Sequence, residues 1–155
     1  MQINPWFITG LVEGEGCFSV SFTLRKKLKL GIETRPSFSL SLNQRDLALI
    51  KELHVFFKCG AVRYSRGDRT YKFEVRSIQD LIHNIIPHFK QHPLRGNKQE
   101  HFQRFEKICH SINANLHRNK KTLLEIIAMA YLMNPSGKRK HEKESLLKIL
   151  DESMV

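Results

Sequence analysis

The chain has 155 residues, of which 41% are hydrophobic, so it fits one domain of ordinary size and is too apolar to be wholly disordered. Its 26 lysines and arginines against 15 acids give a net charge of +11, which indicates a polyanionic partner, either nucleic acid or an anionic membrane. No apolar run approaches the ~20 residues that span a bilayer, and we expect no secretory signal. The three cysteines and eight histidines lack metal-site spacing, which predicts reduced thiols and no structural zinc.

The spacing of the apolar residues, which either alternate or recur at helical intervals, predicts a helix, two strands, a second helix, two more strands and then further helices. The first helix begins after Asn4, whose side chain can cap it, and ends near Gly14 and Gly16. Strict alternation of apolar and polar residues predicts strands over 18–25 and 37–43. The residues between them, 26–33, are predicted to be a hairpin connection or a long strand tip, with Pro36 at an edge or bend.

The second half of the pattern is mainly helical. A helix capped by Asp46 ends at Cys59–Gly60, and two short strands follow over 61–65 and 70–76. Ser77 caps a helix that Pro87 is expected to close within a turn. Helices over 97–114 and 120–133 follow, then a break at 134–137. We expect a domain over 1–135 and a basic C-terminal extension over 136–155, where 146–150 form a small amphipathic helix. The predicted class is α+β, with helices packed on one face of an antiparallel sheet.

Each predicted strand keeps its apolar residues on one side and presents hydrogen-bonding and basic groups on the other. The ordinary alternative is a solvated sheet face, but such a face usually mixes acids with lysines, and here Glu74 is the one acid that we expect. Strands can enter the major groove, where Arg and Lys read guanine and Ser and Thr read several base edges. The residues predicted to face DNA, with phosphate contacts at the strand tips, are Ser19, Ser21, Thr23, Arg25, Lys27, Ser37, Ser39, Ser41, Arg63, Arg66, Thr70, Lys72 and Arg76.

Residues 8–16 form a motif of glycines and acids, Ile-Thr-Gly-Leu-Val-Glu-Gly-Glu-Gly, that resembles the motif of LAGLIDADG homing endonucleases. Further similarity lies at 57–62, like the family's helix-to-strand turn, and at 92–94 followed by Lys98, so the resemblance covers most of 4–135. The resemblance implies an αββαββα core with a saddle-shaped antiparallel sheet. It also implies a metal-dependent endonuclease that cuts both strands of DNA with short 3′ overhangs and promotes intron mobility.

The glycine spacing of the motif has a physical meaning of its own. Gly10 and Gly14 are four apart and share one helix face, which lets another helix approach closely. A single motif then implies a homodimer, with an interface at Phe7, Gly10, Leu11 and Gly14. The alternative is that the glycines only let this helix pack within a monomer. Two copies would bring two Glu15 carboxylates together, which is costly unless a cation lies between them.

The resemblance also assigns roles at the end of the motif. It implies that Glu15 binds the catalytic metals, that the Gly14 carbonyl is a second ligand, and that Glu13 is structural. The expected cofactor is Mg²⁺, with Mn²⁺ or Ca²⁺ able to substitute for binding. No small-molecule substrate is expected.

Two further catalytic residues are implied outside the motif. Gln44 matches a polar residue near the active-site water, although a strand-end hydrogen bond would also explain it. Lys98 matches the basic residue near the scissile phosphate, and Arg95 and Lys90 compete for that role.

Two other functions remain open at this point. One is a catalytically silent protein on the same fold, such as an intron-RNA maturase or a transcription regulator. The other is a basic membrane-surface protein, but its cations should lie on an amphipathic helix, whereas here they lie on strands. We therefore expect double-stranded DNA as the partner and no membrane. A two-fold dimer whose longest strand follows about ten base pairs predicts a pseudo-palindromic site of about 20 base pairs. The family implies an organellar gene, in a chloroplast or mitochondrion.

Overall fold

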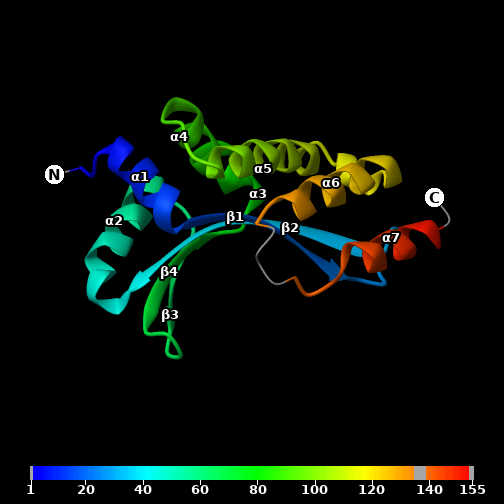
Figure 1. Cartoon of the computed structure of the whole chain (residues 1–155), viewed down its shortest axis with the longest axis horizontal. Coiled ribbons are helices and arrows are strands. Elements are labelled where there is room, and N and C mark those ends of the chain that lie inside the picture. Colours follow the sequence, from blue (N-terminus) through cyan, green and yellow to red (C-terminus); the bar gives the residue numbers. More distant parts are fainter. Residues whose placement is uncertain (1, 135–138, 154–155) are drawn as a thin grey trace. The chain divides into compact units, whose positions relative to one another are not determined.

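The computed structural model describes residues 2–134 and 139–153, and it divides into two compact units. Of the described residues, unit 1 contains 2–18 and 37–100, and unit 2 contains 19–36, 101–134 and 139–153. The strands pair in the order β1-β2-β4-β3 to form an antiparallel sheet (Figure 1), which confirms the predicted α+β class. The first two strands, β1 (Gly16–Leu24) and β2 (Ile32–Asn43), run through both units.

In unit 1 the helices lie on one side of the strands (Figure 1). The cap predicted at Asn4 is present, because its Oδ1 accepts a hydrogen bond from the Trp6 backbone N–H at 2.8 Å. The elements of this unit that follow β2 are η1 (Gln44–Asp46), α2 (Leu47–Phe57), β3 (Ala61–Ser65), β4 (Thr70–Val75), α3 (Ile78–Asp80), a π turn η2 (Leu81–Ile85) and α4 (Ile86–Gln91).

Phe38 lies at the centre of the core of unit 1. Its ring centroid is 5.3 Å from that of Phe18 on β1 and 6.3 Å from that of Phe73 on β4. Two helices add Phe57, at 6.0 Å, and Phe89, at 5.6 Å. Such aromatic pairs each contribute about 0.5–1.5 kcal/mol beyond the burial of their area. The alternation that predicted the inward face of the strands is therefore the pattern that assembles this core.

Unit 2 packs its helices against the remaining parts of β1 and β2. Its elements are α5 (Lys98–Asn113), whose first residues belong to unit 1, η3 (Leu116–Arg118), α6 (Lys120–Leu132) and α7 (Lys143–Asp151). Arg139 joins these parts, since its guanidinium donates to the carbonyls of Val20, at 2.6 Å, and Ala130, and lies over the ring of Tyr131.

The C-terminal helix predicted around 146–150 is present as α7, and it buries Leu146 and Leu150. Residues 135–138, which hold most of the predicted break and the start of the basic run, lie outside the described residues. The division of the chain at residue 135 stays a prediction. No helix of the described part is long and apolar enough to cross a bilayer.

The second strand is longer than predicted. It begins at Ile32, so Glu33 and Arg35, which we assigned to the hairpin connection and its flank, belong to the strand. Pro36 lies inside β2, but the register with β4 begins only at the pair of Phe38 and Val75. On that side the missing N–H of Pro36 therefore removes no ladder hydrogen bond.

One predicted helix end was wrong, and one predicted cap lacks its side-chain hydrogen bond. Pro87 does not close its helix, because a π turn precedes it. In this turn the Ile86 N–H donates to the Leu81 carbonyl. Pro87 then occupies an early position of α4, where no backbone N–H is needed. Asp46 lies at the N-cap position of α2, as predicted, but its side chain makes no capping hydrogen bond. Instead, the Asn43 side chain accepts from the Arg45 N–H at 3.0 Å and starts the short turn η1 before that helix.

A buried polar contact holds α1 (Pro5–Glu15) on α4. The Thr9 hydroxyl donates to the His92 carbonyl at 2.8 Å and lies 3.2 Å from Nε2 of His88. Since the Thr9 hydrogen is used on the carbonyl, His88 must donate its Nε2–H to the Thr9 oxygen, which fixes its neutral tautomer. Burial, with a smaller contribution from neighbouring His92, lowers the pKa of His88 from 6.5 to about 4.

This contact predicts a loss of stability in mild acid. Because the pKa of His88 is lower in the folded chain than in the unfolded chain, its contribution is complete above about pH 6.5 and declines as the pH falls toward about 4. Urea unfolding at about pH 7 and pH 5 should show that the stability advantage of the wild type over His88→Gln shrinks by about 1–2 kcal/mol at the lower pH. An advantage that stays equal at both pH values would contradict this assignment.

Candidate active site and nucleic-acid interface

The two faces of α1 differ sharply. One face is buried through Ile8, Thr9 and Val12. The other carries exposed Gly10 and Gly14, and a Cβ built at either glycine meets nothing within 4 Å in the described chain. On the same helix Trp6 is 56% and Phe7 51% exposed. The glycines are therefore not needed for packing among the described residues, and they leave a bare strip along the helix.

The C-terminal end of α1 is fastened by two charged side chains. Both oxygens of Glu13 accept backbone hydrogen bonds, from Arg95 at 2.8 Å and Gly96 at 3.0 Å. In the opposite direction, the Lys98 ammonium donates to the Val12 carbonyl at 3.0 Å and the Gly16 carbonyl at 2.6 Å. The carbonyls at the C-terminal end of a helix carry partial negative charge, so a cation is favourable there, and the Val12 carbonyl accepts the Gly16 N–H as well as Lys98. Residues 95–98 are thus tied to the end of the motif.

Glu15 is left exposed at this fastened end. No hydrogen bond or ion pair engages its carboxylate within residues 2–134 and 139–153. Behind it, a Cβ on Gly16 would lie 2.5 Å from Cγ1 of Val12, so only glycine fits where the helix passes directly into β1. The structure therefore brings Lys98 to the end of the motif and leaves Glu15 free to meet a ligand.

The other predicted catalytic residues do not contact Glu15 in the described chain. The Gln44 side chain accepts a hydrogen bond from the Tyr64 hydroxyl at 2.9 Å, and its backbone N–H donates to Arg69. Arg95 uses its backbone on Glu13, with its side chain exposed, and Lys90 is exposed on α4. Because its side-chain carbonyl accepts the Tyr64 hydroxyl, Gln44 keeps its amide N–H groups available as donors.

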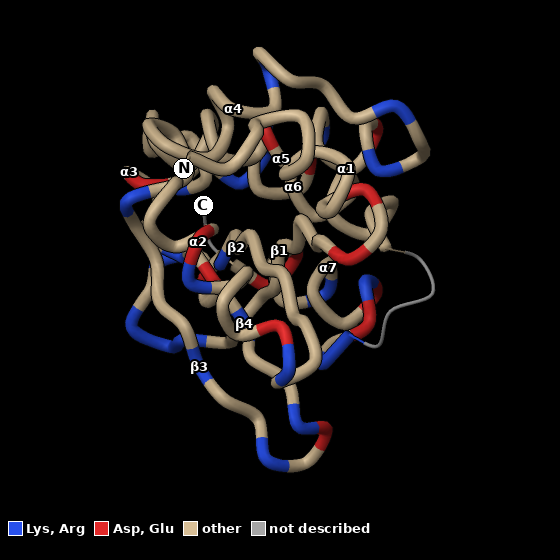
Figure 2. Tube along the Cα trace, turned by 90° about the vertical axis from the view of Figure 1, so that its left-hand side faces the viewer, with Lys and Arg blue, Asp and Glu red and all other residues tan. Residues whose placement is uncertain are grey.

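The polar side of unit 1 follows the strand register. Across β2 and β4, Ser39 lies opposite Glu74 and Ser41 opposite Lys72, and on β3 Arg63 also lies opposite Lys72. Two cations directly opposite each other are destabilising, and Arg63 has no ion-pair partner within the described ranges. Figure 2 shows further cations at the β3–β4 turn. This side of the sheet therefore suits a polyanion.

Thr70 and the β3–β4 turn are held by hydrogen bonds. The Thr70 hydroxyl donates to Asp68 at 2.8 Å. Hydrogen bonds from Ser65 and Thr70 hold the pKa of the Asp68 carboxyl below its usual range, so this carboxylate stays ionised in the basic turn. Thr70 was predicted to face DNA. Because its hydroxyl already donates to Asp68, it could meet a DNA group only as a hydrogen-bond acceptor.

In unit 2 the polar side carries an acid that sequence reasoning missed. Glu33 pairs with Arg25 at 3.2 Å and with Arg35 at 3.0 Å. The expectation of Glu74 as the one acid was therefore wrong, because β2 begins earlier than predicted. Alternation through 33, 35 and 37 was the signal that would have revealed it. Ser21, which donates weakly to the Arg35 carbonyl at 3.4 Å, belongs to the same group.

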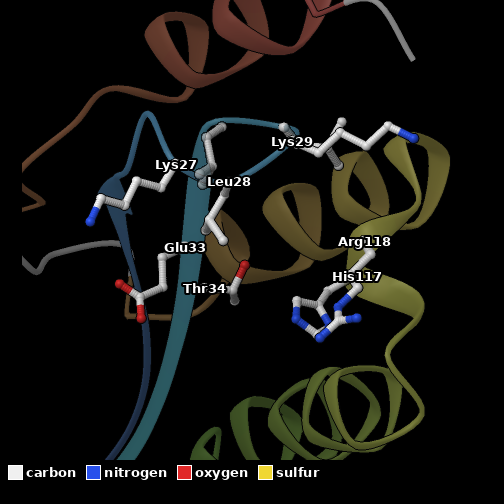
Figure 3. A pocket seen from close by; sticks show the side chains of 9 residues that line it. Lys27, Leu28, Lys29, Glu33, Thr34, His117 and Arg118 are labelled. Carbon is white, nitrogen blue, oxygen red and sulfur yellow. The ribbon is translucent and has the colours of Figure 1, made fainter.

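A pocket of about 450 Å³ in unit 2 is lined by none of the residues of the motif. Figure 3 shows Thr34, His117 and Arg118 toward it, whereas Lys27 and Glu33 point away. Burial, with a smaller contribution from Arg118, lowers the pKa of His117. The pocket therefore opens on the side of β2 that carries Thr34, and the pairs of Glu33 lie on the other side.

A family model described as LAGLIDADG endonuclease matches residues 8–109. The chain is 34% identical over 138 residues to the probable intron-encoded DNA endonuclease 1 of Mycosarcoma maydis, covering 89% of this chain and 49% of the relative. Among solved structures, it is similar to the homing endonuclease I-TnaI, with 30% identity, a TM-score of 0.84 and coverage of 98% of this chain and 99% of the other.

A second structural relative is I-SmaMI bound to an uncleaved DNA target in the presence of calcium ions. Its identity to this chain is 25% and the TM-score 0.86, with 97% of this chain and 50% of the other covered. The chain spans about half the length of the Mycosarcoma maydis relative and of I-SmaMI.

The contacts at the end of α1 predict a stabilising role for Lys98. Lys98→Met should lower the free energy of unfolding by about 2 kcal/mol, because two buried carbonyls lose a charged donor. Arg95→Met removes the same charge three residues away but keeps the backbone bond to Glu13, so it should cost less than about 0.5 kcal/mol. Equal losses in the two variants, measured by urea unfolding, would show that the carbonyl contacts do not matter.

Proposed function

Because the chain belongs to the LAGLIDADG endonuclease family, we propose that it is a site-specific homing endonuclease that hydrolyses both strands of double-stranded DNA as a homodimer with divalent metal ions. The observation that carries this proposal is the bare glycine face of α1, which ends in an unengaged Glu15. The expected target remains a pseudo-palindromic site of about 20 base pairs.

The bare strip of α1 supports the homodimer. Gly10 and Gly14 have open space in front of them, and the neighbouring Phe7 ring is half exposed, so a second helix could cover all three. Such self-complementary contacts close about a two-fold axis. The same geometry argues against the monomer alternative, in which the glycines would be needed by neighbours within this chain. The dimer interface therefore stays assigned to Phe7, Gly10, Leu11 and Gly14.

The donors at the end of α1 fit a hard divalent cation. The Glu15 carboxylate and the Gly14 carbonyl offer the oxygen ligands that Mg²⁺ prefers. The described residues contain no cluster of three or more His, Cys, Asp or Glu that could hold a metal, so the remaining ligands would come from water, DNA phosphate and the second copy. When bound, divalent cations would activate water for in-line attack on phosphorus and stabilise the leaving 3′ oxygen.

The chain's own residues would position this chemistry. The Lys98 side chain contacts the end of α1 directly, which favours it over the other candidate cations, Arg95 and Lys90, for the scissile phosphate. Glu13 would hold the Lys98 segment in register with Glu15. Gln44, whose carbonyl accepts the Tyr64 hydroxyl, would offer its side-chain N–H donors to water or phosphate.

The basic strand sides support DNA as the partner. The opposed cations Arg63 and Lys72 would be relieved by phosphate or by the acceptor-rich edge of guanine. DNA is also the ligand named for I-SmaMI, and calcium accompanies it there, which supports divalent metal use here. The intron-encoded relative supports a role in intron mobility, and the assignment to an organellar gene stays a prediction.

The catalytic assignment predicts the effect of one substitution. Glu15→Gln should lower plasmid cleavage in Mg²⁺ by at least about two orders of magnitude, since a neutral amide is a poor metal ligand and bound metals stabilise the transition state by several kcal/mol. Binding to the same DNA, measured by gel shift in Ca²⁺, should be retained. EDTA should abolish wild-type cleavage. Wild-type binding without cutting in Mg²⁺ would instead support a catalytically silent maturase or regulator.

The dimer assignment predicts that a larger side chain at Gly14 stabilises the monomer but weakens self-association. Gly14→Leu should raise the melting temperature of the dilute monomer slightly, because leucine favours helix over glycine and has open space here. The same change should weaken self-association about tenfold to a hundredfold by overfilling the helix contact. Ala48→Leu, exposed on α2, is the matched control and should leave association unchanged. Sedimentation showing an unaltered Gly14→Leu dimer would exclude this interface.

A further inference from the structure

One acid on the basic side of unit 1 is almost completely buried. Glu74 on β4 is 7% exposed, and each of its oxygens binds a different cation: Oε2 lies 3.3 Å from Nζ of Lys72, and Oε1 lies 3.1 Å from Nε of Arg76. The side chains of the two cations remain 43% and 61% exposed. The acid thus lies beneath two side chains whose ends reach solvent.

We infer that Glu74 is a positioning residue that sets base specificity, by holding Arg76 so that it reads a guanine in the major groove. This inference rests on the proposed function, since it concerns the DNA that the endonuclease would bind. Neither Arg76 nor Lys72 is predicted to contact the reacting phosphates. The role of Glu74 is therefore one of recognition and not of catalysis.

The geometry of the Arg76 contact carries the argument. A guanidinium has five N–H donors in a rigid fork, and the ion pair with Glu74 uses the one on Nε. The two terminal nitrogens remain available side by side, which is the pair that binds O6 and N7 of guanine together. An arginine without such an anchor loses more side-chain entropy when it binds, and it binds phosphates as readily as bases.

The neighbours of Glu74 leave room for this arrangement. Across the sheet the acid faces Ala61 on β3 and Ser39 on β2, both of them small. Neither can cover the ends of Arg76 and Lys72. A base edge could therefore approach the anchored cations from the solvent side of the strands.

The negative charge of Glu74 has an effect on DNA binding that is separate from its contact with Arg76. Glu74 cancels part of the positive charge that attracts DNA, so it lowers affinity for any sequence. If Glu74 also fixes the arginine that reads a base, it raises the ratio of specific to non-specific affinity. The two effects have opposite signs in experiment, which makes them separable.

The test compares Glu74→Gln with Glu52→Gln, which makes the same charge change at an exposed position of α2, and with Arg76→Lys, which keeps the charge but removes the fork. The preferred site of the wild type is first selected from a randomised DNA pool. Affinity is then measured, at one salt concentration, for that site, for each single base-pair replacement and for random duplex.

We expect the wild type to prefer one G·C pair in each half-site by about tenfold to a hundredfold. Glu74→Gln should reduce that preference to about threefold or less while its affinity for random duplex rises. Arg76→Lys should lose preference at the same base pair, and Glu52→Gln should keep it. Glu74→Gln is nearly isosteric, and unchanged discrimination at all other base pairs serves as the check that it is folded.

Two results would overturn the inference. One is a Glu74→Gln variant whose base preferences match those of the wild type, and the other is an equal loss in Glu52→Gln. Either would leave the proposed function intact if the wild type still selects and cuts a site. A wild type that selects no DNA at all would overturn both the inference and the proposed function.

Discussion

The structure depends on anchoring α1 from one side only. Thr9 and His88 hold its inner face, and Glu13 and Lys98 hold its C-terminal end. Because these contacts lie within unit 1, the opposite face of the helix needs no neighbour from the described chain. In the proposed homodimer this helix would offer its backbone to another helix, and the contacts at its inner face and its end would keep it fixed in its own fold.

The arrangement also determines the electrostatics of the helix end. The carbonyls of Val12 and Gly16 would make the surroundings of Glu15 more negative, and the Lys98 ammonium offsets that field. A cation that already lies on two carbonyls needs little rearrangement to meet a phosphate nearby. Stability and the proposed chemistry thus use the same side chain. In this respect Lys98 differs from Glu15, whose carboxylate has no hydrogen bond or ion pair among the described residues.

The sequence predicted the parts of the fold that rest on local pattern. Alternation identified the inward residues of β1 and β4, such as Phe18 and Phe73, and the cap at Asn4 followed from residue type alone. The motif located Glu15. The contact between Lys98 and α1 joins residues more than 80 positions apart, so no local pattern could reveal its partners, and only the resemblance placed Lys98 near the site.

The misses have physical causes as well. Charged residues and Pro36 concealed the early start of β2, because strand patterns weigh against both, and so the acid at Glu33 was overlooked. Pro87 was taken as a helix end, although a π turn before it removes the steric and hydrogen-bonding conflict. The role of Gln44 stays a prediction, since its contact with Tyr64 concerns the strand end and not the motif.

The position of β3 has a consequence for how the protein behaves in concentrated solution. As the last strand in the order β1-β2-β4-β3, it exposes one row of unpaired backbone groups, which is the usual starting point for edge-to-edge aggregation. Arg63 in this short strand and Arg66 directly after it place repulsive charge along that edge. The cations that we assign to DNA would therefore also act as gatekeepers that keep free copies from stacking into fibrils, and their protection would weaken as salt screens them.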